Sequence, residues 1–253
     1  MKLKKTSQLL IYSIFLLSPL QAIRPTLHNL SFHLSSFHLS RLHYIHKTNL
    51  SFKNGSQILA IVGMGGLGKT HLAKEYTIQH AQDHDILWWF DSNQDLLPQL
   101  QDLGEKLNTL RGCQFPNSRE RSLSLWVRAL KVCCEKHFPS TLFILDDVKN
   151  KEQTSELIKG LPHAHILLTS RDPTIESNIM ILKGFSRKES IQYLKKALPQ
   201  GNFKEWNQLA ASLKDYPLAL AQASSYIRSF PSLSITEYLN LYQKQKEALL
   251  KAE

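Results

Sequence analysis

Short apolar runs alternate with longer amphipathic segments through most of this chain. Each run is almost continuously hydrophobic, which is typical of a strand that is buried on both faces of a parallel sheet. Runs of this kind predict strands over residues 56–62, 85–92, 141–148, 165–171 and 179–185. Trp88 and Trp89 are neighbours on one of these strands, so we expect one ring on each face of the sheet.

The segments between the runs carry apolar residues at the three- and four-residue spacing of a helix with one buried face. Helices are predicted over residues 95–110 and 119–138, and a third begins at Thr70. Strands that alternate with helices predict an α/β fold, a three-layer sandwich with a parallel sheet at its centre.

The pattern changes at Ser186, after which helical periodicity continues without further strands. Ser186 and Glu189 have the spacing of a capping box, which marks the start of a helix. Pro217 suits the first turn of a later helix. Residues 186–248 are therefore predicted to form a small all-helical subdomain.

The first 53 residues differ from the rest. Basic residues precede an apolar run from Leu9 to Leu20, and Ala22 offers a small residue for cleavage, so residues 1–22 resemble a signal peptide. The run is shorter than the roughly 18 to 20 residues that span a bilayer. A membrane-surface segment and an extension without function stay open as alternatives. Residues 23–53 are predicted to be a basic, poorly ordered linker, whose regularly spaced histidines do not converge on a metal.

Charge and cysteine content argue against a nucleic-acid-binding protein and against a disulfide-linked or zinc-binding one. The formal net charge is +10, but seven of the 31 Lys and Arg residues and none of the 21 Asp and Glu residues lie in residues 1–53, which leaves the remainder at +3. We expect no nucleic-acid binding, because that needs basic residues gathered on the folded domain. Cys113, Cys133 and Cys134 are predicted to be buried reduced thiols, as in the cytosol, rather than disulfide or zinc ligands.

Residues 63–70, GMGGLGKT, match the phosphate-binding pattern G-x-x-x-x-G-K-[ST] between a predicted strand and a predicted helix. The glycines let the backbone approach a phosphate, Lys69 would reach the β- and γ-phosphates, and Thr70 would hold Mg²⁺. Residues 54–185 are therefore predicted to be a P-loop NTPase domain. We predict nucleotide contacts from Gly63, Gly65, Gly66, Leu67, Gly68, Lys69, Thr70 and His71.

Polar residues end two further strands. Because parallel strands end at the same edge of a sheet, Asp146, Asp147 and Arg171 are expected near the phosphates. Asp146 is predicted to hold Mg²⁺ together with Thr70. Asp147 is predicted to polarise an attacking water, and Arg171 to detect or stabilise the γ-phosphate.

The order of these motifs resembles the NB-ARC family of STAND-class signalling ATPases, in particular bacterial members with helical repeats after the switch module. The segments that carry the resemblance are GMGGLGKT, ILWWFDS, LFILDDV, ILLTSR and DYPLALAQASSYI, all within residues 54–245. The resemblance implies an ADP/ATP-bound switch, in which Pro217 packs against the adenine and exchange of ADP for ATP opens the closed form.

Two departures accompany this resemblance. The Gly-Arg-Glu segment that helps to hold adenine in the family is not matched by residues 37–46, FHLSRLHYIH. The chain ends at Glu253, before the family's winged-helix domain and repeats, so we expect a truncated form, a stand-alone module or a partner of another chain.

The motifs together predict a cytoplasmic ADP/ATP-binding switch module with slow hydrolysis at most, which acts with a protein partner or a second copy of the chain. Two alternatives stay open. One is a catalytically active ATPase or phosphotransferase. The other is an exported or membrane-associated protein with a vestigial nucleotide site, and membrane contact is predicted only through the leader, residues 1–22.

Overall fold

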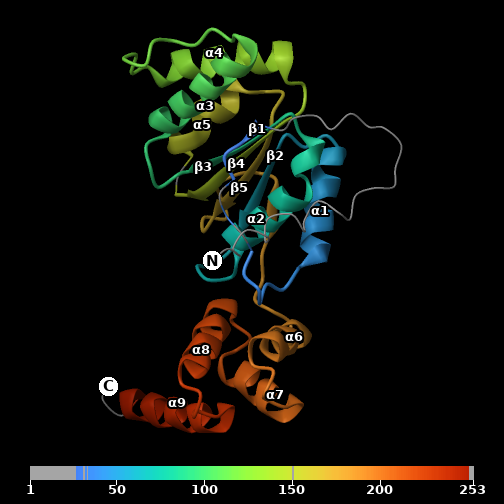
Figure 1. Cartoon of the computed structure of the whole chain (residues 1–253), viewed down its shortest axis with the longest axis vertical. Coiled ribbons are helices and arrows are strands. Elements are labelled where there is room, and N and C mark those ends of the chain that lie inside the picture. The colour runs from blue at the N-terminus through green and yellow to red at the C-terminus, as the bar shows by residue number, and fades with distance from the viewer. Residues whose placement is uncertain (1–26, 31, 33, 150, 251–253) are drawn as a thin grey trace, which may run out of the picture.

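A six-stranded parallel sheet forms the centre of the larger of two units (Figure 1). The computed structural model describes residues 27–30, 32, 34–149 and 151–250, so the predicted leader lies outside the described residues. The strand order is β1-β3-β4-β5-β2-β6. The strands are β1 (Leu27–His28), β2 (Ile58–Val62), β3 (Ile86–Asp91), β4 (Thr141–Val148), β5 (His165–Ser170) and β6 (Ile179–Ile181).

Helices cover both faces of this sheet, which confirms the three-layer α/β sandwich (Figure 1). One face packs against α3, α4 and α5 and the other against α1 and α2, so the strands are buried on both sides as their continuous apolar runs predict. Trp88 belongs to the first core and Trp89 packs against the second. The helices are α1 (Leu42–Lys53), α2 (Lys69–Gln79), the 3-10 turn η1 (Ala81–Asp83), α3 (Leu96–Arg111), α4 (Leu123–His137) and α5 (Glu152–Gly160).

The smaller unit consists of helices that follow β6, and it has a core of its own around Leu194, Leu209 and Leu220. Both halves of the Ser186–Glu189 capping box form at the start of α6, and Pro217 is the first residue of α8. These contacts confirm the two helix starts that the sequence predicts. The helices are α6 (Arg187–Ala197), α7 (Phe203–Ser212), α8 (Pro217–Ser229) and α9 (Ile235–Leu250).

The prediction of a poorly ordered linker over residues 23–53 is wrong for the part that the structure describes. Residues 42–53 form α1, and β1 pairs with β3 at the edge of the sheet. Tyr44, Thr48 and Phe52 recur every four residues and are buried, so α1 has one buried face of mostly apolar residues. Its histidine-rich composition conceals that face. The sequence also misses α5, and β6 is shorter than the strand predicted over residues 179–185.

The prediction of three reduced thiols is wrong for two of them. Cys113, just after α3, forms a disulfide with Cys133 of α4, with Cα atoms 5.7 Å apart. The two helices pack against each other, and this brings together residues that are 20 positions apart in the sequence. Cys134 remains a free buried thiol, and burial raises its pKa to about 12.

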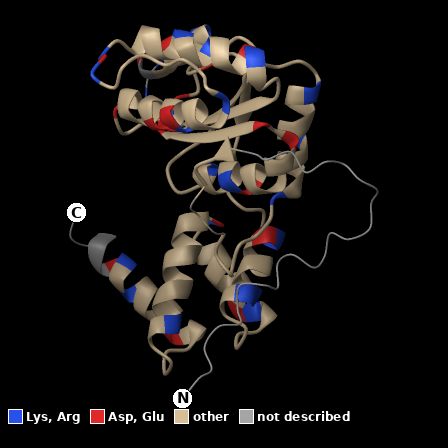
Figure 2. Cartoon of the chain, turned by 45° about the horizontal axis from the view of Figure 1, so that its top comes forward, with Lys and Arg blue, Asp and Glu red and all other residues tan. Residues whose placement is uncertain are grey.

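Charged residues of both signs are interspersed along the helices of both units (Figure 2). This distribution agrees with the small net charge of the chain after residue 53. Within residues 27–250, leaving aside the undescribed positions, no helix is both long and apolar enough to cross a bilayer.

Candidate functional site

The loop between β2 and α2 winds around the side chain of Lys69. Gly66 and Gly68 adopt left-handed φ angles of 75° and 94°, which glycine accepts at no steric cost. Lys69 begins α2, and its Nζ donates to the carbonyl oxygens of Gly63 at 2.8 Å and Met64 at 3.1 Å. Burial lowers the pKa of Lys69, and the positive charge of Arg171 lowers it further. A desolvated ammonium group therefore stands at the centre of the loop.

Thr70 and Asp146, predicted to share a metal, lie in contact. The Thr70 hydroxyl donates to Asp146 Oδ1 at 2.9 Å, and the Thr169 hydroxyl donates to the same oxygen at 2.6 Å. A hydroxyl and a carboxylate are hard oxygen ligands, the type that Mg²⁺ prefers. The donor set at the end of β4 therefore fits a magnesium ion that is bound with phosphate.

Asp147 is turned away from its neighbour by a break in the strand. The register between β4 and β5 shifts after Leu145, and Asp147 has a left-handed φ of 57°. Its backbone N–H donates to the Thr169 hydroxyl at 2.9 Å, and Asn93 Nδ2 donates to its carboxylate at 3.2 Å. The two adjacent carboxylates thus accept from different donors, although the Thr169 hydroxyl contacts both residues. Asn93 is a site residue that the sequence reasoning missed.

Arg171 and the start of α8 complete the walls around the loop. A Cβ on Gly65 would lie 3.5 Å from Cζ of Arg171, which brings the guanidinium against the loop. The backbone N–H of Leu218 donates to the Gly66 carbonyl at 3.2 Å, and the Tyr216 hydroxyl donates to the Gly65 carbonyl. The helical subdomain therefore touches the phosphate-binding loop directly.

A cavity of about 590 Å³ opens between these groups. Gly63 lies at the base of the loop, under Lys69, and is not part of the cavity wall. All the other residues that the sequence predicts for the site line the cavity: Gly65, Gly66, Leu67, Gly68, Lys69, Thr70, His71, Asp146, Asp147, Arg171 and Pro217.

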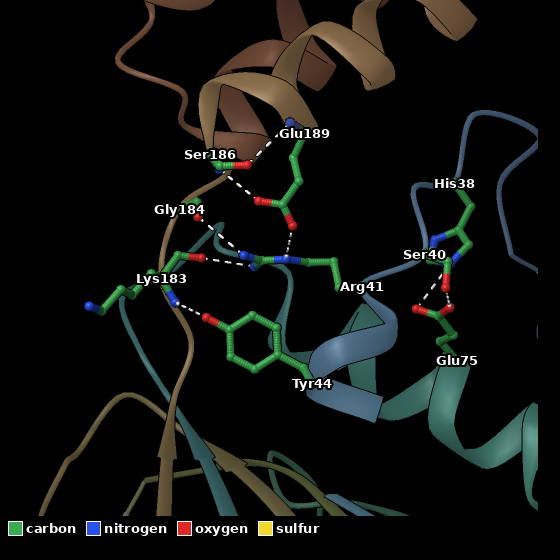
Figure 3. A network of polar contacts seen from close by, with 9 residues as sticks. All are labelled: His38, Ser40, Arg41, Tyr44, Glu75, Lys183, Gly184, Ser186 and Glu189. Atoms are coloured by element: carbon green, nitrogen blue, oxygen red, sulfur yellow. Dashed lines mark hydrogen bonds and ion pairs between the residues drawn. The ribbon is translucent and has the colours of Figure 1, made fainter. Parts of the chain in front are cut away.

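Residues 35–41, here called the strap, form a further wall that the sequence reasoning assigned to a linker. Nδ1 of His38 lies 2.8 Å from Nε2 of His71. Nε2 of His38 lies 3.1 Å from the Glu75 carboxylate, which also accepts from the Ser40 hydroxyl (Figure 3). Burial by itself raises the pKa of Glu75, but the hydrogen bonds from His38 and Ser40 outweigh it and hold the pKa below its ordinary value. Burial, then the neighbouring His38, lowers the pKa of His71.

The NB-ARC domain profile matches residues 43–197, which is more than half of the chain. The chain belongs to the NB-ARC family. Its phosphate-binding loop and paired acids lie within the matched residues, so the chain contains a nucleotide-binding signalling module of a family that binds ADP and ATP.

The NB-ARC chain is similar to a curated relative that is much longer than the chain itself. It is 27% identical over 218 residues to the TMV resistance protein N of Nicotiana glutinosa, an alignment that covers 76% of this chain and 18% of that protein. The chain thus spans about a fifth of the length of that relative.

Two solved structures share the fold of this chain. The Walker-type ATPase PABY2304 of Pyrococcus abyssi has a TM-score of 0.61 at 13% identity, over 86% of this chain and 78% of that one. The STAND protein with a tetratricopeptide repeat sensor, PH0952 of Pyrococcus horikoshii, has a TM-score of 0.51 at 16% identity, over 72% and 29%.

Proposed function

We propose that this NB-ARC module is a switch whose two units are held together by ADP and released when ATP replaces it, with slow hydrolysis at most. The observation that carries the proposal is the shared wall of the cavity, since Leu218 of α8 donates to the Gly66 carbonyl of the phosphate-binding loop. A nucleotide in this cavity touches both units, so ADP and ATP can stabilise different arrangements through different contacts.

The residues around the loop would act on the phosphates. Lys69 binds the β- and γ-phosphates, and Thr70 with Asp146 holds Mg²⁺. When bound, Mg²⁺ neutralises charge on the phosphate oxygens. Asp147 orients a water and Arg171 contacts the γ-phosphate, while Pro217 covers the adenine. Asn93 donates to one of the two carboxylate oxygens of Asp147, which leaves the other oxygen to orient the water.

The cytoplasm is our proposed location, because a nucleotide switch needs a pool of ATP. The Cys113–Cys133 disulfide is an observation that favours the exported alternative, since disulfides persist in oxidising compartments. A fusion of residues 1–30 to a reporter distinguishes the two locations. The module's partner is proposed to be another protein or a second copy of the chain.

Calorimetric titration of the whole chain with ADP and ATP, with and without Mg²⁺, tests the nucleotide site. Lys69→Ala should weaken binding by roughly 10- to 100-fold, because a hydrogen bond to a charged group contributes about 1.5–3 kcal/mol. Lys106→Ala is the matched control, since Lys106 is half-exposed on α3 and pairs with Asp102. Asp146→Asn should reduce the effect of Mg²⁺.

Three results would contradict parts of this proposal. If wild-type protein binds neither nucleotide, the switch is wrong, and if Lys69→Ala binds as tightly as wild type, the site is wrong. Turnover faster than about 1 s⁻¹, the low end of ordinary enzymes, would favour the ATPase alternative.

A further inference from the structure

Arg41, at the end of the strap, is buried between the two units and makes several polar contacts there (Figure 3). Its Nε donates to Glu189 at 3.0 Å, Nη1 to the Lys183 carbonyl at 2.9 Å and Nη2 to the Gly184 carbonyl at 3.2 Å. The guanidinium also lies over the rings of Tyr44 and Phe185. Each nitrogen of the guanidinium is therefore used by a protein group.

The partners of Arg41 belong to the connection between the units. Lys183 and Gly184 lie between β6 and α6, the segment called the hinge here (residues 182–186). Glu189 belongs to the capping box of α6, where its second oxygen accepts from the Ser186 N–H at 2.7 Å. One guanidinium thus joins the strap, the hinge and the first turn of the helical subdomain.

The rest of the strap is attached to both units as well. His38 and Ser40 contact Glu75 of α2, while Lys196 of α6 donates to the His38 carbonyl at 3.0 Å and Arg228 of α8 lies over the Phe37 ring. Because Phe37 and His38 line the cavity, moving α6 and α8 away from the sheet also pulls on a cavity wall. Arg41 opposes that movement through its hydrogen bonds to Glu189 and the two hinge carbonyls.

The contact between Arg41 and Glu189 is protected from water. The side chains are 8% and 19% exposed, so separating them leaves a guanidinium and a carboxylate without their partner in a poorly solvated place. Burial by itself raises the pKa of Glu189, but hydrogen bonds from Ser186 and the charge of Arg41 hold it below its ordinary value. The Glu189 side chain is therefore ionised and bound to Arg41 when the two units are closed.

We propose that Arg41 is a positioning residue that latches the helical subdomain over the nucleotide cavity, through Glu189 and the hinge carbonyls, and that release of this latch limits the rate at which nucleotide leaves. The latch rests on the proposed function, because it regulates the same cavity. In this proposal Arg41, which lines the cavity, holds the two units together.

Release of a fluorescent ADP analogue, chased with excess unlabelled ATP, measures the latch in the full chain. Glu189→Gln removes the charge of the pair while an amide oxygen can still accept from Ser186, so we expect release at least fivefold faster than in wild type. Arg41→Lys keeps the positive charge but loses the fork of donors, so its release rate should lie between those of wild type and Glu189→Gln. The double variant should be less than additive, since both changes break one contact.

Glu205→Gln is the matched control. Glu205 occupies the same position in the capping box of α7, with Asn202, and its contacts include the Thr236 hydroxyl rather than an arginine. Its release rate should stay within twofold of wild type, although both variants lower the melting temperature by a similar amount. Equal acceleration in Glu205→Gln would overturn the latch, because loss of the capping box alone would then explain the effect.

Hydrogen exchange in the absence of nucleotide gives a second, independent readout. Glu189→Gln should speed exchange of the hinge amides, including Lys183, whose N–H donates to the Tyr44 hydroxyl at 3.3 Å. Unchanged hinge exchange with unchanged release would overturn the latch and leave the nucleotide site standing. Failure of wild-type protein to bind the ADP analogue would instead overturn the proposed function, and the latch with it.

Discussion

Gly66 carries two constraints at the level of a single residue. Its backbone is left-handed, and a Cβ there would lie 2.8 Å from Cβ of Leu218 and 2.9 Å from the Tyr216 hydroxyl. The phosphate-binding pattern leaves this position open, yet only glycine lets α8 reach the loop. The need for glycine comes from the neighbouring unit as well as from the phosphate.

Gly66→Ala should therefore weaken ADP binding by tenfold or more and lower the melting temperature. Gly55→Ala is the control, because Gly55 has a φ of 88° but open space around a Cβ. Both changes cost about 1–2 kcal/mol of backbone strain, while only Gly66→Ala pushes α8 away. Calorimetry with ADP separates the two effects, and equal ADP affinity in the two variants would contradict the close approach of α8.

Asp215 stabilises the turn between α7 and α8 through its charge. Arg187 donates to both carboxylate oxygens at 2.8 Å, and this hydrogen bonding lowers the pKa of Asp215 despite partial burial. A carboxylate whose pKa is lower in the folded state contributes stability above its unfolded pKa of about 3.9 and loses it as the pH falls through the folded value.

Asp215→Asn should lower the free energy of unfolding by about 1 kcal/mol at pH 7, since the pair is partly exposed. Asparagine tolerates the left-handed φ of 55° at this position. The difference from wild type should shrink as the pH falls below about 4. Urea unfolding between pH 7 and pH 3 checks this, with Asp102→Asn on an exposed turn of α3 as the control. A difference that grows on acidification would contradict the assigned ion pair.

At the scale of elements, the packing of α3 on α4 shows that sequence patterns identify helices but do not predict how two helices align. Apolar spacing identifies both helices, and the Asp95 carboxylate accepts from the Leu97 N–H at the start of α3. The pairing of Cys113 with Cys133 depends on how the helices align, which the spacing of cysteines does not encode. The disulfide closes a loop of 20 residues that contains most of the connection between them.

Replacing both Cys113 and Cys133 by Ser should lower the free energy of unfolding by about 3 kcal/mol, the value for a loop of similar length. Dithiothreitol should lower the melting temperature of wild type and leave the double variant unchanged. Cys134→Ser keeps the disulfide and should retain the sensitivity to reductant. A wild-type protein that melts at the same temperature with and without reductant would show that the two thiols are not joined.

At the scale of the whole molecule, the chain has separate buried clusters that meet at the nucleotide cavity. The sheet domain has one core on each face, and the helical subdomain has a third whose members come from residues 194–235. Contacts between the units run through the strap, the hinge and the first residues of α8. The units can therefore move relative to each other without opening a core.

Leu209→Ala should destabilise the helical subdomain by about 2–5 kcal/mol, because Leu209 is fully buried in its core. Hydrogen exchange should quicken in α6 to α9 and stay slow in the central strands. Leu107 is equally buried on α3, so Leu107→Ala should quicken exchange in the central strands and leave exchange in α6 to α9 slow. Uniform acceleration throughout the chain in both variants would mean that the two units unfold as one.

The sequence by itself determined most of the strands and helices, with α1 and α5 as exceptions, and it determined the phosphate-binding loop. Strand and helix periods, helix caps and the glycines of residues 63–68 act over a few neighbouring residues, so local patterns report them directly. The alignment of Thr70 with Asp146 also followed, because parallel strands end at one edge of the sheet.

Only the tertiary structure decided which distant side chains share the cavity and join the units. His38 lies beside His71, Cys113 beside Cys133 and Arg41 beside Glu189, and the last pair is 148 positions apart. Such contacts depend on how whole amphipathic faces pack, and nothing in the local spacing of either partner specifies the other. For the same reason a histidine-rich stretch that resembles a linker became α1 and a wall of the site.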